Sequence, residues 1–286
     1  MSEDNLAAPI LTEVVGQPVS GGHIEVAGTA QSGLSSIPTI SFSGTVTLYD
    51  ADTVVGTGTV DRSGNFDIET ASTFEDGLYD LKAVETGNGL TSPASTGLLV
   101  PIGTQAQIEL YYSQILQRTA SSAEVNAWVT AETSGQLTYS QILSDIVNSP
   151  EAVEFVDPII RLYEVALGRI PDQAGLQGWE NALASGAITE AQIAQAIVNS
   201  PEFLADHGGT NQVTATFVAG LYQTALGRQG SAAEIHSWVN SGQTAAQILR
   251  GFSDSAQFVH DTQVQIAELL TSAGQGLQVF DGHSLV

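Results

Sequence analysis

Three copies of one residue frame constrain the fold of this chain more than any other feature. In each copy a tyrosine stands six residues before an arginine, and that arginine stands ten residues before a tryptophan. The copies are Tyr112, Arg118 and Trp128; Tyr163, Arg169 and Trp179; and Tyr222, Arg228 and Trp238. All three tryptophans and three of the seven basic residues belong to this frame. Such fixed spacing predicts a repeated structural unit, but does not by itself name a ligand.

Around each frame the apolar residues recur with the period of a helix. The stretch before each arginine carries them at i, i+3, i+4, i+7 and i+8, which predicts an amphipathic helix with one buried face. Gly168 and Gly227 follow the last apolar residue, where a left-handed residue ends a helix, and Gln117 takes that place in the first copy. Three residues after each arginine stands an N-cap candidate that opens a second helix: Ser121, Asp172 or Ser231.

A third helix and a closing box complete each copy. Thr138, Thr189 and Thr244 each precede a glutamine by three residues, the spacing of a capping box. Copies one and two close with Asn-Ser-Pro-Glu at 148–151 and 199–202, whereas copy three has Asp-Ser-Ala-Gln at 254–257. We therefore predict an all-helical domain over 103–286, with copies at about 104–155, 156–206 and 213–262 and a C-terminal tail.

The first hundred residues have the period of two that is typical of strands. Apolar and polar residues alternate within short runs broken by Gly, Asn, Asp, Ser and Pro. The predicted strands are 10–15, 23–29, 45–49, 53–60, 65–70, 78–85 and 97–102. Seven strands at this spacing predict a β-sandwich over residues 1–102, so the expected class is multidomain, β then α.

Two stretches carry family resemblances. The string VTLYDADTVVGTGTVDRSGNFDIET resembles the bacterial immunoglobulin-like repeats of surface adhesins and type I secreted proteins, which implies a spacer that is occasionally adhesive. LYEVALGRIPDQAGLQGW, followed by IAQAIVNSPEF, resembles the bacterial repeat known as domain of unknown function 4214. That resemblance implies a secreted or cell-surface protein, similar to S-layer proteins that attach to lipopolysaccharide. The Leu-Gly-Arg core is also similar to phycobilisome linkers, which no other feature supports.

Composition narrows the function classes. A net charge of −24 repels phosphate backbones, so nucleic acid is excluded as the expected partner. The many carboxylates make Ca²⁺ the candidate cofactor. Asp50, Asp52 and Asp61 lie in turns and are the candidate ligands, although the favoured interpretation is that they are solvated turn residues.

The sequence also bears on membrane insertion and export. There is no run of 18 apolar residues and no cleaved signal, so we expect no transmembrane segment and export by another route. The apolar C-terminal end resembles an uncleaved type I export signal, with a docked β-tail as the alternative.

The repeated frame supplies the candidate ligand-binding residues. Each arginine can hold a carboxylate or sugar hydroxyls, and each tryptophan can stack on a pyranose face. The favoured alternative is structural, with the arginine tying the loop between helices and the tryptophan filling the core of its copy. The candidates are Tyr112, Arg118, Trp128, Tyr163, Arg169, Asp172, Trp179, Tyr222, Arg228 and Trp238. No zinc, P-loop, dinucleotide or nucleophile motif occurs, so we expect no enzyme.

These observations lead to one functional expectation and one alternative. We expect a non-enzymatic extracellular or cell-surface protein that binds surface polysaccharide, such as capsule or lipopolysaccharide, in adhesion or S-layer-like anchoring. The alternative is a structural assembly subunit, either a homo-oligomeric surface-layer component or a host-capsule-binding spike of a phage-like particle. Because the acidic surface repels an acidic glycan, we favour a calcium bridge over direct reading of neutral hydroxyls.

Overall fold

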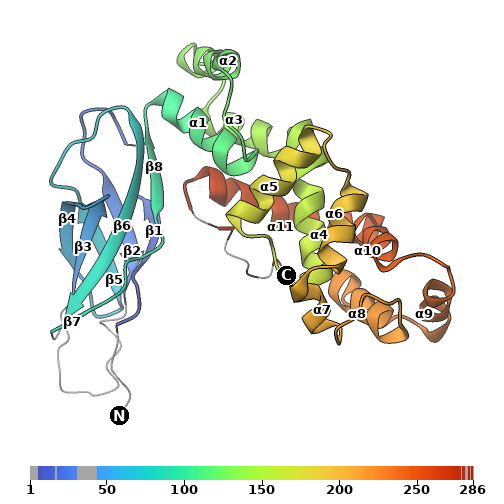
Figure 1. Cartoon of the computed structure of the whole chain (residues 1–286). Helices are drawn as coiled ribbons and strands as arrows, with labels where there is room; N and C mark the ends of the chain where they lie inside the picture. Colours follow the sequence, from blue (N-terminus) through green and yellow to red (C-terminus); the bar gives the residue numbers. More distant parts are fainter. Residues whose placement is uncertain are drawn as a thin grey trace. The chain divides into compact units, whose positions relative to one another are not determined.

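The chain forms two compact units. The computed structural model describes residues 6–16, 18–30, 44–87, 89–277, 279–280, 283 and 285. The first unit comprises Met1–Tyr111, Ala120–Thr138 and Ser272–Gln278, and the second comprises Tyr112–Thr119, Tyr139–Thr271 and Val279–Val286. The change from strands to helices falls at the residues predicted, between β8 and α1 (Figure 1). The compact units, however, divide the first helical copy between them.

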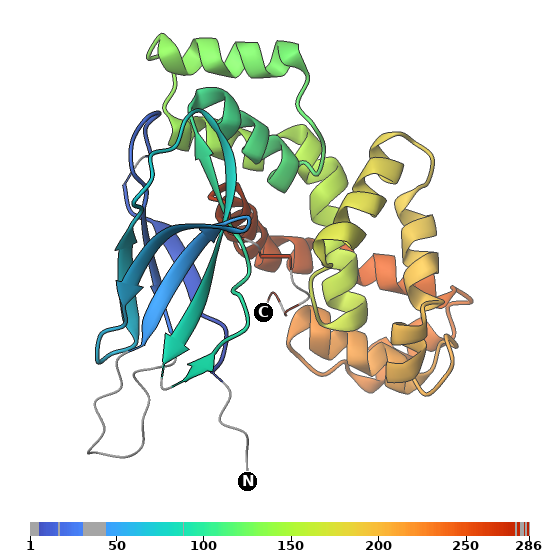
Figure 2. The same cartoon turned by 60° about the vertical axis from the view of Figure 1, so that its left-hand side comes forward.

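A β-sandwich forms the N-terminal part of the first unit. The described residues contain eight strands: β1 (Ile10–Val14), β2 (Glu25–Thr29), β3 (Thr45–Asp50), β4 (Thr53–Thr59), β5 (Asn65–Glu69), β6 (Gly77–Gly87), β7 (Leu90–Thr91) and β8 (Leu98–Ile102). One sheet has the order β1-β2-β5, and the other has the order β4-β3-β6-β7 with β8 also paired to β6. All seven predicted strands are present, drawn from blue to green in Figure 2. The two-residue β7 is too short to show a period.

The sequence alternation places the sandwich core as expected. Val46 and Leu48 of β3 and Phe66 and Ile68 of β5 are buried, while their neighbours along each strand are at least partly exposed. The glycines of β4 make room for this core, because a Cβ at Gly58 would lie 2.6 Å from Ile68 Cγ1. Strand β4 pairs with β3, whereas the fourth strand of a constant-type immunoglobulin domain lies in the other sheet. The fold is therefore an immunoglobulin-like sandwich with four principal strands in the β3 sheet.

Helices and their connecting loops make up the chain from Thr104 to Gly274, as predicted. The helices are α1 (Thr104–Ile115), α2 (Ser122–Thr133), α3 (Tyr139–Val147), the π-helical turn η2 (Ala152–Val156), α4 (Asp157–Leu167), α5 (Gln173–Ala184), α6 (Glu190–Val198), α7 (Pro201–Asp206), α8 (Ala215–Leu226), α9 (Ala232–Val239), α10 (Ala245–Ser253) and α11 (Ala256–Gly274). In the second unit α10 packs against α4, α6 and α8. No helix in the described part of the chain has both the length and the hydropathy to cross a bilayer.

The predicted caps determine where these helices begin and end. Ser121, Thr189, Ser231 and Thr244 form reciprocal capping boxes with the Glu or Gln three residues on. Gly168 and Gly227 end α4 and α8 in the left-handed region, with φ of 64° and 59°. Local sequence therefore sets the element boundaries.

Candidate functional site

Each arginine of the frame lies over the ring of its own tyrosine. The distance from the guanidinium carbon to the ring centroid is 4.9 Å for Arg118, 5.4 Å for Arg169 and 4.7 Å for Arg228. The six-residue spacing produces this contact, because the helix ends after the tyrosine and the following loop turns the arginine back over the ring. Such cation–π contacts favour the placement of each guanidinium over its ring.

In copies one and two the same arginine also forms an ion pair with the glutamate of the closing box. Arg118 Nε donates to Glu151 Oε1 and Arg118 Nη2 donates to Glu151 Oε2 at 2.8 Å, and Arg169 Nε and Nη2 donate to the two oxygens of Glu202 at 2.6 Å. Both pairs use two parallel hydrogen bonds, the strong arrangement for arginine and carboxylate. The guanidinium of Arg169 lowers the pKa of Glu202 through these bonds. The arginine therefore ties the interhelix loop to the end of its copy.

Copy three satisfies its arginine differently because it has no glutamate in the closing box. Gln257 stands at that position, and Arg228 Nη2 instead donates to Glu234 Oε1 of α9 at 2.9 Å. Glu234 also accepts from the backbone of Ser231 as part of the α9 capping box. The hydrogen bonds from Arg228 and Ser231 lower the pKa of Glu234 to about 2. Because copy three lacks the glutamate of the closing box, its arginine pairs with Glu234, which is only six residues away.

The tryptophans fill the core of their copies only in part, since Trp238 packs on the buried ring of Phe252 at 5.4 Å between centroids but is not itself fully buried. Trp128, Trp179 and Trp238 are all only partly buried, whereas Leu176, one turn before Trp179, is fully buried. The indole N–H of Trp179 donates to the Tyr163 hydroxyl at 2.9 Å, and that of Trp238 donates to the Tyr222 hydroxyl at 3.2 Å. Part of each indole therefore remains accessible, and in copies two and three its polar edge is held in place.

Asp172, the remaining candidate, is an N-cap. Its Oδ1 accepts the backbone N–H of Gly175 at 2.8 Å and so begins α5, as the sequence predicted. This capping role explains the presence of Asp172 without requiring a bound ligand. Whether any of the ten candidate residues binds a ligand stays a prediction.

Gln117 joins copies one and two, a role that sequence reasoning missed. It is buried and has a left-handed φ of 55°, a conformation that usually selects glycine. Its amide donates to Gln114 O at 2.6 Å and accepts from Gln173 Nε2 of α5. These bonds offset the backbone strain. The sequence does show that Gln117 replaces the expected glycine, which marks the position as unusual. It does not show the partner of Gln117, because Gln173 lies 56 residues away.

The C-terminal tail lies along the loop that carries Arg169. Ile170 N donates to His283 O at 2.8 Å, Gln173 N donates to Phe280 O at 3.1 Å, and Leu285 N donates to Glu164 Oε2 at 3.0 Å. The Phe280 side chain is buried. The described residues Phe280, His283 and Leu285 thus contact copy two of their own chain. Nearer α11, Leu277 forms an isolated antiparallel bridge with Leu98 of β8.

The candidate calcium turn at Asp61 has a local explanation. Asp61 Oδ1 accepts the backbone N–H groups of Ser63 and Asn65, both at 2.8 Å, and the bond from Asn65 is the main cause that lowers the pKa of this carboxyl. Among the described residues, no three His, Asp or Glu side chains come together as a metal site. Calcium binding stays a prediction.

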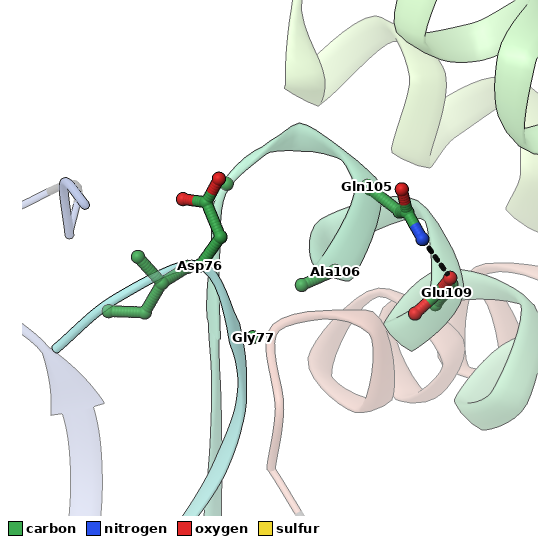
Figure 3. Close-up of a pocket in the computed structure, with 7 residues that line it drawn as sticks. Asp76, Gly77, Gln105, Ala106 and Glu109 are labelled. Atoms are coloured by element: carbon green, nitrogen blue, oxygen red, sulfur yellow. Dashed lines mark hydrogen bonds between the residues drawn. The ribbon is translucent and has the colours of Figure 1, made fainter.

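A small pocket in the first unit also has carboxylates on its rim. It holds about 250 Å³ between the start of β6 and the first turns of α1 (Figure 3). Gln105 Nε2 donates to Glu109 Oε1 at 2.8 Å, and Asp76 lies beside Gly103, where a Cβ would fall 2.8 Å from the carboxylate. Asp76 and Glu109 are both exposed. Two solvated carboxylates do not form a ligand site.

Comparisons with known proteins find a family match within the helical region and a solved structure that is similar over about a third of the chain. Residues 153–207 and 195–262 match the family described as Domain of unknown function (DUF4214), so copies two and three each carry a match. No curated protein matches the chain. Among solved structures, fibronectin(III)-like modules of Clostridium thermocellum CbhA are similar at 22% identity and a TM-score of 0.22, over 34% of this chain and 92% of theirs. Copies two and three of the helical region therefore match DUF4214.

Proposed function

We propose that this protein is a non-catalytic extracellular or cell-surface module that binds surface polysaccharide through its tryptophans, with the sandwich as a spacer. The partial exposure of all three frame tryptophans supports this most directly. In copies two and three the hydrogen bond to tyrosine fixes the ring. A flat aromatic ring whose polar edge is satisfied suits the apolar face of a pyranose, because it loses little entropy on stacking.

The repetition of the frame favours a polymeric ligand. A protein with three similar aromatic surfaces gains avidity when one ligand chain engages more than one of them. A polysaccharide offers the same face at every repeating unit, whereas a small metabolite does not. With 31 acidic and seven basic residues, the protein repels nucleic acid, which leaves glycans as the better polymer class.

Replacing Trp179 or Trp238 with alanine is expected to lower retention on immobilised capsular polysaccharide or lipopolysaccharide about tenfold, the equivalent of one stacking contact of about 1.4 kcal/mol. Binding is measured by surface plasmon resonance on each glycan, with folding checked by circular dichroism. Tyr163→Phe removes the hydroxyl that holds the indole but leaves both rings, so it should change retention far less. Val264→Ala, at a site on α11 that is 62% exposed, serves as the neutral control.

Unchanged binding by the alanine variants of Trp128, Trp179 and Trp238 would refute the aromatic contact. Analytical ultracentrifugation without glycan tests the alternative of an assembly subunit. Self-association at micromolar concentration, together with no binding to any glycan, would favour that alternative.

Calcium chelation is a separate prediction, based on charge. We expect EGTA at fixed ionic strength to lower retention on an acidic glycan about tenfold, because a divalent ion shared by protein and glycan acids offsets their repulsion. A neutral glycan tested in parallel is the control and should be insensitive. If retention on the acidic glycan is unchanged, the calcium bridge is wrong and the hydroxyls are read directly by aromatic and amide groups.

A further inference from the structure

Glu180 of α5 is a buried acid whose charge is not compensated by hydrogen bonds. The residue is 1% exposed, and neither of its carboxylate oxygens has a hydrogen-bond partner among the described residues. Burying an ionised carboxylate in this way is costly, and proteins usually neutralise or pair such a group. The position therefore requires an explanation beyond packing.

The repeat itself shows that folding does not need an acid here. Glu180 follows directly after the frame tryptophan, and the same position holds Val129 in copy one and Val239 in copy three. Both valines are partly buried. An apolar residue thus suits this helix position, and copy two alone carries a titratable group at it.

Glu180 faces the ion pair that closes copy one. Helix α5 packs against η2, which directly follows Glu151, and against α4. Burial is the main cause that raises the pKa of Glu180, to about 7; the charge of Glu151 raises it further and that of Arg118 lowers it. The other charged groups on the elements packed against α5 are Glu154 of η2 and Asp157, Arg161 and Glu164 of α4.

We propose that Glu180 makes the junction between copies one and two a proton-operated latch. When Glu180 is protonated, α5 packs closely against the loop that carries Arg118 and against Glu151. With Glu180 ionised, a negative charge in a dry site beside Glu151 favours states in which α5 opens to water. This inference is independent of glycan binding.

The direction of the pH effect follows from linkage. The acid of an unfolded chain titrates near 4.5 and the folded one near 7, so the folded junction binds the extra proton between these values. The stabilisation is therefore complete below about pH 4.5 and is lost as pH rises through about 7, with no further change above.

Amide hydrogen exchange of the whole protein at pH 6 and pH 8, corrected for intrinsic rates, tests the latch. The opening equilibrium of α5 amides should rise about tenfold between these pH values. The corresponding helix of copy one, α2, carries Val129 and provides the internal reference. Glu180→Val and Glu180→Gln should both abolish the increase in α5, and Glu151→Gln should move it to lower pH.

Equal opening of α5 in the native protein at both pH values would overturn the proposal. So would a native-like pH response in Glu180→Gln, a variant that keeps the shape of the side chain and remains informative if the valine variant does not fold. A carboxyl carbon titration by NMR that places Glu180 near its ordinary value of 4.5 would also overturn it.

Discussion

Replacing Phe203 with alanine should lower the free energy of unfolding by about 3–5 kcal/mol, the loss expected when a fully buried phenyl ring leaves a cavity. Phe203 lies in α7 with no exposed surface. Its ring stacks on His207 at 3.9 Å between centroids and meets the edge of Phe217 of α8 at 6.0 Å. It therefore links the end of copy two to the start of copy three. Urea denaturation followed by far-ultraviolet circular dichroism measures the effect.

Phe155→Ala is the matched control for this prediction. Phe155 is the same residue type in the closing segment of copy one, but it is only partly buried. Its removal should cost about 1 kcal/mol, since less apolar surface leaves water on folding. Equal losses at both positions would mean that Phe203 does not anchor the junction between copies two and three.

A single methyl group at Gly28 should destabilise the sandwich by about 3 kcal/mol. A Cβ at this position of β2 would lie 2.3 Å from Phe66 Cζ and 2.4 Å from Ile10 O, so both the core ring and the β1 backbone stand in its way. The backbone cannot retreat without breaking the pairing of β2 with β1 or β5. Differential scanning calorimetry of Gly28→Ala should show the sandwich melting at lower temperature.

Gly220→Ala provides the contrasting control. Gly220 lies in the interior of α8, and a Cβ there would meet nothing within 4 Å. Alanine should therefore stabilise the protein by about 0.5–1 kcal/mol through helix propensity. If Gly28→Ala melted like the native protein, the close approach of Phe66 to β2 would be wrong.

The sequence by itself determined seven of the eight described strands and the ends of the helices that carry predicted caps. Strand alternation at Val46 and Leu48, the capping boxes at Ser121 and Thr189, and the left-handed stop at Gly168 all depend on residues within a few positions of one another. Such local interactions form in the same way whatever the surrounding fold. They were therefore sufficient to predict a β-sandwich followed by a helical array.

Only the tertiary structure decided what the repeated frame contacts. Arg118 and Arg169 find glutamates 33 residues away, Gln117 meets Gln173 across 56 residues, and the C-terminal tail pairs with Ile170. Spacing along the chain cannot give these partners, because they depend on how loops bring distant segments together. The partial burial of the tryptophans and the full burial of Glu180 have the same origin, since a helix stripe predicts an inward side but not which neighbours cover it.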